Sequence, residues 1–142
     1  MLKVGVFRTL PVQLVFMALL LFLNAPPSFS EESLILQPDQ EGVQRVKINM
    51  ESYVYSPNNL VVELGKPVEV TLENNSFLVP HNFLLDSPAG ERLVDITLSS
   101  GEIETVQFTL TTPGTYPFYC DKQLLFFPNH REEGMEGTIL VR

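Results

Sequence analysis

The sequence contains one cysteine, two histidines and no tryptophan in 142 residues. A single cysteine excludes a disulfide bond within the chain. Cys120 is therefore either an inert thiol buried in a core or a protected thiolate, such as a metal ligand. The sequence also lacks any segment with a sustained helical period, so a helical domain is not expected.

Acidic side chains are absent from residues 1–30, which contain Lys3 and Arg8 followed by an apolar run at 14–23. Small residues precede Ser30, and this combination is typical of a secretory signal peptide. The alternative is a retained membrane anchor, but a membrane-spanning helix needs about 20 apolar residues. We expect 1–30 to be a signal peptide and the protein to be exported, periplasmic or extracellular, with no stable membrane insertion after its removal.

Basic residues are few, since nine lysines and arginines face seventeen aspartates and glutamates, for a net charge of −8. Two of the nine basic residues and none of the acidic ones lie in residues 1–30, so the net charge of the remainder is −10. This excess of negative charge disfavours binding to nucleic acid and favours basic protein partners.

The rest of the chain predicts strands separated by turns. Residues 31–42 contain charges and Pro38 but little apolar rhythm, so they predict a leader segment before a single domain at 43–142. Strict alternation at 68–73 indicates a half-buried strand. The predicted strands lie at 43–50, 60–64, 68–73, 81–85, 96–98, 103–110, 115–120 and 137–141. Short strands at regular spacing predict an all-β domain, an antiparallel β-sandwich or barrel.

Side chains that bind metals are scarce, and most of them fit one site. After residue 30 the chain has two histidines, one cysteine and two methionines, of which four can be combined: His81, Cys120, His130 and Met135. Two imidazoles, a thiolate and a weak thioether form the ligand set of a mononuclear copper centre with a long axial methionine. Zinc could use the same side chains, but methionine is a poor zinc ligand.

Three segments carry a resemblance to a known family: Pro80-His81-Asn82, the aromatic strand 114–120, and residues 130–138 with a His-x4-Met spacing. Together and in this order they resemble the plastocyanin–azurin family of small blue copper proteins, the cupredoxins. The resemblance implies a Greek-key sandwich and one copper per chain, with the metal ligands His81, Cys120, His130 and Met135. It also implies that Asn82 ties the two ligand loops together by hydrogen bonds and so orients the ligands.

The spacing between Cys120 and His130 departs from this family, in which a tight loop joins the two ligands. Nine residues separate them here, and the insertion 122–128 is largely apolar. We expect the extra residues to bulge outward while the ligands still converge. Residues 124–127 then either fold against the domain or form a docking surface for a partner.

The expected function is electron transfer outside the cytoplasm by a protein that cycles one copper between Cu(II) and Cu(I). We expect a monomer with basic, cytochrome-like redox proteins as partners. The alternative is a copper-binding or copper-delivery protein whose metal is cargo. An enzyme is not expected, because copper enzymes of this type need further histidines and the binuclear copper domain needs two cysteines. The sequence has only two histidines and one cysteine.

Overall fold

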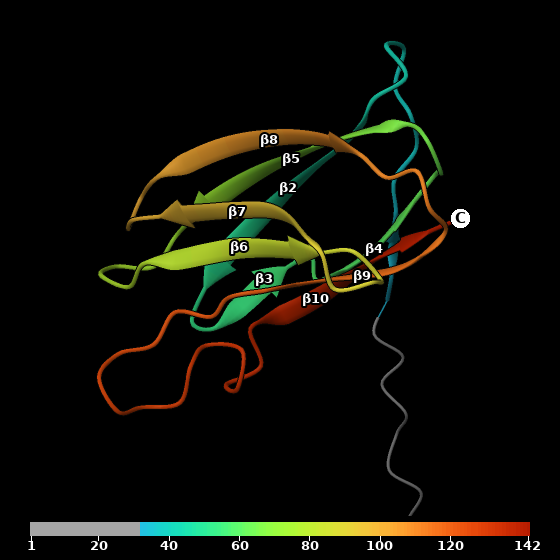
Figure 1. Ribbon diagram of the computed structural model, residues 1–142. Helices are drawn as coiled ribbons and strands as arrows, with labels where there is room; N and C mark the ends of the chain where they lie inside the picture. The colour runs from blue at the N-terminus through green and yellow to red at the C-terminus, as the bar shows by residue number, and fades with distance from the viewer. Residues whose placement is uncertain (1–31) are drawn as a thin grey trace, which may run out of the picture. The chain divides into compact units, whose positions relative to one another are not determined.

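The computed structural model describes residues 32–142, in which ten strands form two sheets (Figure 1). The strands are β1 (Leu34–Ile35), β2 (Gln44–Glu51), β3 (Val54–Ser56), β4 (Asn59–Val62), β5 (Pro67–Asn74), β6 (His81–Asp86), β7 (Arg92–Leu98), β8 (Ile103–Thr109), β9 (Gly114–Tyr119) and β10 (Glu136–Val141). The all-β prediction is confirmed for these residues. They contain no helix long and apolar enough to cross a membrane. The signal peptide predicted at 1–30 lies outside the described residues, and the domain boundaries stay predictions.

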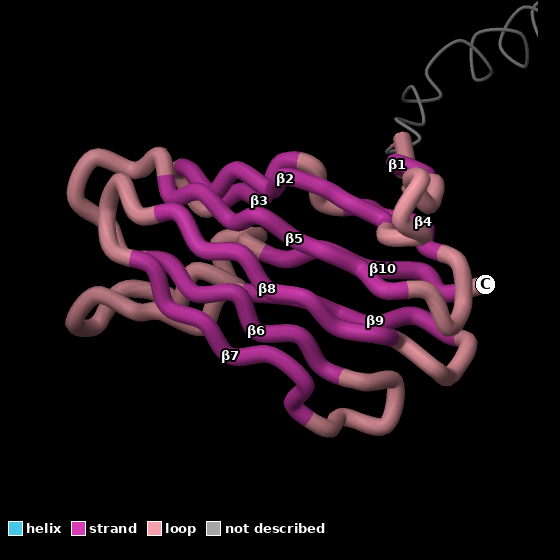
Figure 2. The backbone as a smooth tube through the Cα atoms, turned by 90° about the horizontal axis from the view of Figure 1, so that it is seen from above, coloured by secondary structure: helices cyan, strands magenta, loops and turns pink. Residues whose placement is uncertain are grey.

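The two sheets enclose one hydrophobic core. The six-stranded sheet has the order β1-β4-β10-β9-β6-β7, and the four-stranded sheet has the order β3-β2-β5-β8. In β2 and β5, every second side chain is buried, as a strand with one face on a core requires. Both sheets contribute to a single core cluster, which includes the fully buried Ile48, Leu72, Phe83, Phe118 and Ile139. The strands run side by side and most loops gather at their two ends (Figure 2).

Strand pairing is mixed, which corrects the expectation of a purely antiparallel fold. β2 pairs with β5 in parallel, and β4 pairs in parallel with both β1 and β10. The other pairs are antiparallel: β2–β3, β5–β8, β6–β7, β6–β9 and β9–β10. The chain changes sheets between β3 and β4 and again between β4 and β5. β5 therefore lies beside β2 and runs in the same direction. The alternation of buried and exposed residues does not encode this direction.

One end of the six-stranded sheet brings the predicted ligand segments together. β6 and β9 are antiparallel neighbours, so His81, the first residue of β6, lies near Cys120, which directly follows β9. The loop that contains His130 and Met135 then connects β9 to β10 and is drawn in orange to red in Figure 1. Sheet topology thus places ligands that are distant in sequence at one site.

Candidate metal centre

Three of the predicted ligands lie together and are buried. His81 and Cys120 are fully buried, and His130 is only 4% exposed. The Nδ1 atoms of the two histidines are 3.1 Å apart. Sγ of Cys120 lies 3.2 Å from Nδ1 of His130 and 3.8 Å from Nδ1 of His81. Among the residues that the structure describes, these three form the one group of histidine, cysteine or acidic side chains whose ligand atoms converge for a metal ion.

Backbone hydrogen bonds close the base of the long loop. The N–H of His130 donates to the carbonyl oxygen of Lys122 at 2.8 Å, and the N–H of Met135 donates to that of His130 at 2.9 Å. The N–H of Cys120 donates to the carbonyl oxygen of Met135 at 3.1 Å. His130 therefore returns to Cys120, and the intervening residues 123–129 bulge away from the ligands.

The bulge presents four large apolar side chains to solvent. Leu124, Leu125, Phe126 and Phe127 are 65%, 78%, 84% and 53% exposed. The rings of Phe126 and Phe127 stack on each other with their centroids 5.0 Å apart. These side chains lie on the surface and are not packed into the domain core.

Asn82 joins the strand that begins with His81 to the start of the long loop. Its Nδ2–H donates to Oδ1 of Asp121 at 2.8 Å, and its Oδ1 accepts from the N–H of Asp121 at 3.1 Å. Its own backbone N–H donates to Sγ of Cys120 at 3.4 Å. Asn82 thus contacts both ligand segments, and its role in orienting the ligands stays a prediction.

Met135 is fully buried. Its backbone bonds to both Cys120 and His130. The preceding Gly134 has a φ of 100°, a conformation that glycine adopts without the steric cost of a side chain. This turn positions Met135 before β10, and ligation by its thioether stays a prediction.

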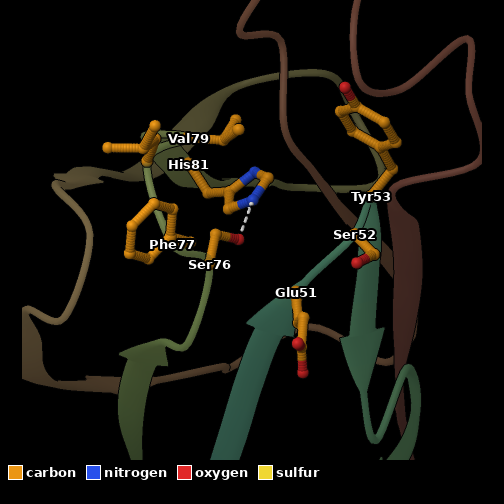
Figure 3. A pocket seen from close by; sticks show the side chains of 8 residues that line it. Glu51, Ser52, Tyr53, Ser76, Phe77, Val79 and His81 are labelled. Atoms are coloured by element: carbon orange, nitrogen blue, oxygen red, sulfur yellow. Dashed lines mark hydrogen bonds between the residues drawn. The ribbon is translucent and has the colours of Figure 1, made fainter.

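His81 is held from the side that faces away from the cluster. Its Nε2 forms a hydrogen bond with Oγ of Ser76 at 2.8 Å (Figure 3), while its Nδ1 faces Cys120 and His130. Metal-binding histidines are commonly fixed in this way, because the bond at one ring nitrogen sets the tautomer and leaves the other for the metal.

Burial favours the uncharged forms of all three side chains. It lowers the pKa of His81 from 6.5 to about 4, and the nearby His130 adds to this effect. Burial and the charge of Lys122 also lower the pKa of His130. Burial raises the pKa of the Cys120 thiol, although backbone hydrogen bonds from Asn82 and Lys122 oppose the change. At neutral pH both imidazoles offer lone pairs, and a bound metal ion would drive the proton off the thiol.

The donor set and its spacing fit one copper ion. Imidazole nitrogen and thiolate sulfur bind metal ions at roughly 2.0–2.3 Å, so donors that share an ion lie about 3–4 Å apart. The three separations here are 3.1, 3.2 and 3.8 Å. Two imidazoles and one thiolate are the trigonal ligands of blue copper centres.

Tyr53 belongs to this site, and the sequence analysis did not find it. Its ring centroid lies 4.7 Å from that of His130 and 6.4 Å from that of His81, with edge-on packing in both cases. Tyr53 and Ser52 form the two-residue connection between β2 and β3. Such connections are usually marked by Asn-Gly or Asp-Gly, and neither is present here. Ser76 lies between the predicted strands 68–73 and 81–85, and the sequence pattern gives no sign of its bond to His81.

Tyr119 anchors the residue that follows His130. Its O–H donates to Oδ2 of Asp86 at 2.8 Å and accepts from Arg92 at 2.8 Å. The guanidinium carbon of Arg131 lies 4.0 Å from the centroid of the Tyr119 ring, within the range of a cation–π interaction. The loop is therefore tethered to β9 immediately after its histidine.

A family profile described as a cupredoxin-like domain matches residues 13–141. The chain belongs to this family. It is also similar to plastocyanin from Prochlorothrix hollandica, with 33% identity over 112 residues that cover 73% of this chain and 76% of that protein. Chloroplastic plastocyanin from Oryza sativa subsp. indica is 36% identical over 94 residues, 62% of this chain and 54% of the rice sequence. The match thus spans about half of the rice protein.

A solved structure agrees with this cupredoxin at the level of fold. Dithionite-reduced auracyanin from Roseiflexus castenholzii superposes with a TM-score of 0.60 at 24% identity, covering 69% of this chain and 96% of that one. The family membership confirms the resemblance seen in the sequence, the sandwich fold, and copper as the cofactor that the residues His81, Cys120 and His130 have the chemistry to hold.

Proposed function

We propose that this cupredoxin is an exported electron-transfer protein that cycles one copper ion between Cu(II) and Cu(I). The observation that carries the proposal is the convergence of three buried donors, His81, Cys120 and His130, within 3.1 to 3.8 Å of one another. A copper ion held there supplies a one-electron redox couple. The sheet and the base of the loop hold the donors in place, so the donors need to move little when the oxidation state of the copper changes.

The fourth ligand of this site is the thioether of Met135. Its complete burial and its backbone bonds to Cys120 and His130 support this assignment. A weak axial sulfur adjusts the reduction potential more than it holds the metal. The second equally buried methionine, Met50, lies on β2 and offers a matched comparison.

The protein acts without making or breaking substrate bonds. Both histidines of the chain belong to one cluster, which leaves none for a second copper site. The competing function is copper delivery, in which the metal is cargo. Full burial of His81 and Cys120 supports retention of the metal, since a delivery site must pass its ion to a partner.

The redox partner is a basic, cytochrome-like protein met outside the cytoplasm. The net charge of −10 after residue 30 would attract such a partner, and the exposed apolar residues 124–127 lie on the loop that holds His130. A surface patch of this kind often marks an interaction site. Export rests on the signal peptide at 1–30, which lies outside the described residues.

The test is copper titration of the purified protein, followed by the visible spectrum. We expect one Cu(II) per chain and an intense thiolate-to-copper band that ascorbate bleaches and ferricyanide restores. Cys120→Ser should abolish the band, and a band that survived would refute the ligand assignment. A site that gave up its Cu(I) to a chelator within seconds, without reversible redox cycling, would favour delivery.

A second pair of variants tests Met135. Met135→Leu should retain copper and colour but raise the reduction potential, because loss of the sulfur donor disfavours Cu(II). Met50→Leu removes an equally buried methionine outside the cluster and should leave the potential unchanged. Loss of copper in Met135→Leu would show that Met135 is a principal ligand. Equal reduction potentials in both variants would show that Met135 does not bind the copper.

A further inference from the structure

Tyr53 packs against both buried histidines and is itself partly exposed. Its ring packs edge-on against His130 at 4.7 Å and His81 at 6.4 Å between centroids. The histidines are 4% and 0% exposed, whereas Tyr53 is 40% exposed. One face of the same side chain therefore covers the ligands while the rest meets solvent.

Tyr53 also divides the surface above the site into two pockets. A pocket of about 440 Å³ is lined by His81, Ser76 and Phe77 with Tyr53 on its opposite side (Figure 3). A second pocket of about 350 Å³ is lined by His130 and Phe127, again with Tyr53. Tyr53 is the residue that both pockets share. The two pockets border His81 and His130 respectively, yet these histidines stay 0% and 4% exposed, and the ring of Tyr53 stands between the pockets.

The backbone holds this ring in place at a steric cost. Ser52 and Tyr53 have φ values of 49° and 64°, in the left-handed region that side chains disfavour. They connect β2 to β3 at the paired residues Glu51 and Val54. Glycine or asparagine would fit this turn better. Strained residues that persist in a fold often serve its function, and here the strained turn places a tyrosine over the ligands.

We propose that Tyr53 closes the histidine pair to water and small anions, so that bound copper exchanges electrons without taking up a ligand from solution. This inference rests on the proposed function, because exclusion matters only for a site that must keep its coordination unchanged. Removing the ring would join the two pockets directly above His81 and His130. Removing a neighbouring pocket wall such as Phe77, which is 87% exposed, would not.

The first test uses the metal-free protein and is independent of copper. Diethylpyrocarbonate modifies unprotonated imidazole, and peptide mass spectrometry gives the rate at each histidine. We expect Tyr53→Ala to speed modification of His130 and His81 by at least about tenfold, the ratio that corresponds to a barrier change near 1.4 kcal/mol. Tyr53→Phe, which keeps the ring, and Phe77→Ala should react like the wild type. Equal rates in Tyr53→Ala and wild type would overturn the proposal.

The second test titrates sodium azide into the Cu(II)-loaded proteins and follows the visible and electron paramagnetic resonance spectra. Azide should bind Tyr53→Ala at least about tenfold more tightly than wild type, Tyr53→Phe or Phe77→Ala. Equal azide affinities would refute exclusion even if copper transfers electrons as proposed. A wild type that binds no Cu(II) would instead refute the proposed function, while the modification rates would still report whether the ring covers the histidines.

A third variant separates the ring from the strained turn. Tyr53→Gly removes the ring but suits the φ of 64°, so it should fold more stably than Tyr53→Ala. Both variants should show the same increase in histidine modification and in azide affinity. If Tyr53→Gly stayed as closed as the wild type, loss of the ring would not by itself open the site, and the proposal would fail.

Discussion

The two histidines of the metal cluster are held by different parts of the molecule. His81 begins β6, which pairs with β7 and β9 through sheet hydrogen bonds, and Ser76 fixes its outer ring nitrogen. His130 lies in a loop that returns to the cluster through a bond to Lys122. One side of the site is built into a sheet, while the other depends on a few contacts at the base of a loop.

The loop side compensates for its lack of strand pairing with tethers. Arg131 lies over the ring of Tyr119 on β9 and forms an ion pair with Glu136 at 2.9 Å. Asp121 bonds to Asn82 at the other end of the loop. These contacts allow a long, exposed bulge to coexist with a closely placed His130. The sheet thus supplies a fixed half-site, and the loop can vary outside its tethered base.

The largest effect should come from lowering the pH of the metal-free protein, and mainly from the strand histidine. Its folded pKa is about 4 against 6.5, so between these values the unfolded chain binds a proton that the folded chain rejects. The contribution of the uncharged His81 to the free energy of unfolding should be fully present above pH 6.5 and should be lost as the pH drops toward 4. The loss from His81 should be at most about 3 kcal/mol, at 1.36 kcal/mol per pKa unit. Urea unfolding at a series of pH values measures this loss.

Variants of the two histidines sharpen this prediction. His130 contributes with the same sign, because its pKa is also lowered, but His81 is the more deeply buried of the two and its pKa falls to about 4. Removing His81 by His81→Gln should therefore flatten the pH dependence between 6.5 and 4 more than His130→Gln does. The reverse order would mean that the loop side, and not the sheet side, buries its imidazole more effectively.

The next largest effect should come from breaking the hydrogen bonds that join the sheet side of the site to the loop side. Asn82→Ala removes two hydrogen bonds to Asp121, at 2.8 and 3.1 Å, and should lower the free energy of unfolding by about 2 kcal/mol, since each such bond contributes about 1 kcal/mol. Denaturant unfolding of the metal-free protein measures the change. Asn75→Ala is the control, because Asn75 makes an exposed bond to Asn49 at 3.3 Å and should cost less than about 0.5 kcal/mol. Equal losses would show that the side chain of Asn82 contributes no more to stability than that of an exposed asparagine.

The sequence predicted the sheet side of the site better than the loop side, for a physical reason. Alternation at 68–73 predicted β5, because a strand with one buried face has apolar side chains on that face and polar side chains on the other. His81, Cys120, His130 and Met135 were predicted as ligands together, because the chain has few other metal-binding side chains. The bond from His130 to Lys122 could not be predicted, since it joins backbone groups that every residue shares.

Strand neighbours and the short β2–β3 connection were missed for related reasons. The parallel pairing of β2 with β5 depends on where the chain changes sheets, and alternation is the same for either direction. Tyr53 occupies a position in a two-residue turn, and such turns are usually recognised in a sequence by their glycine. Its ring over the histidines is therefore visible only in three dimensions.

The smallest effect on stability, and the sharpest test of the bulge, comes from replacing Leu125 and Phe126 together with serine. These side chains are 78% and 84% exposed, so the free energy of unfolding should change by less than about 0.5 kcal/mol and copper should remain bound. Electron transfer to a basic c-type cytochrome should slow by at least about threefold, because an apolar contact that slows dissociation of a transient complex is lost. Stopped-flow absorbance measures this rate.

Two comparisons decide what the bulge does. Oxidation by ferricyanide, a small reagent that needs no apolar docking surface, should be unchanged in the double variant. Leu93→Ser removes an exposed apolar side chain of β7 near the end of the β6–β7 hairpin opposite His81, and should leave both rates unchanged. A marked loss of stability would show that Leu125 and Phe126 pack against the domain after all. Unchanged transfer to the cytochrome would mean that the partner reaches the copper by another face, and that the loop can vary freely outside its tethered base.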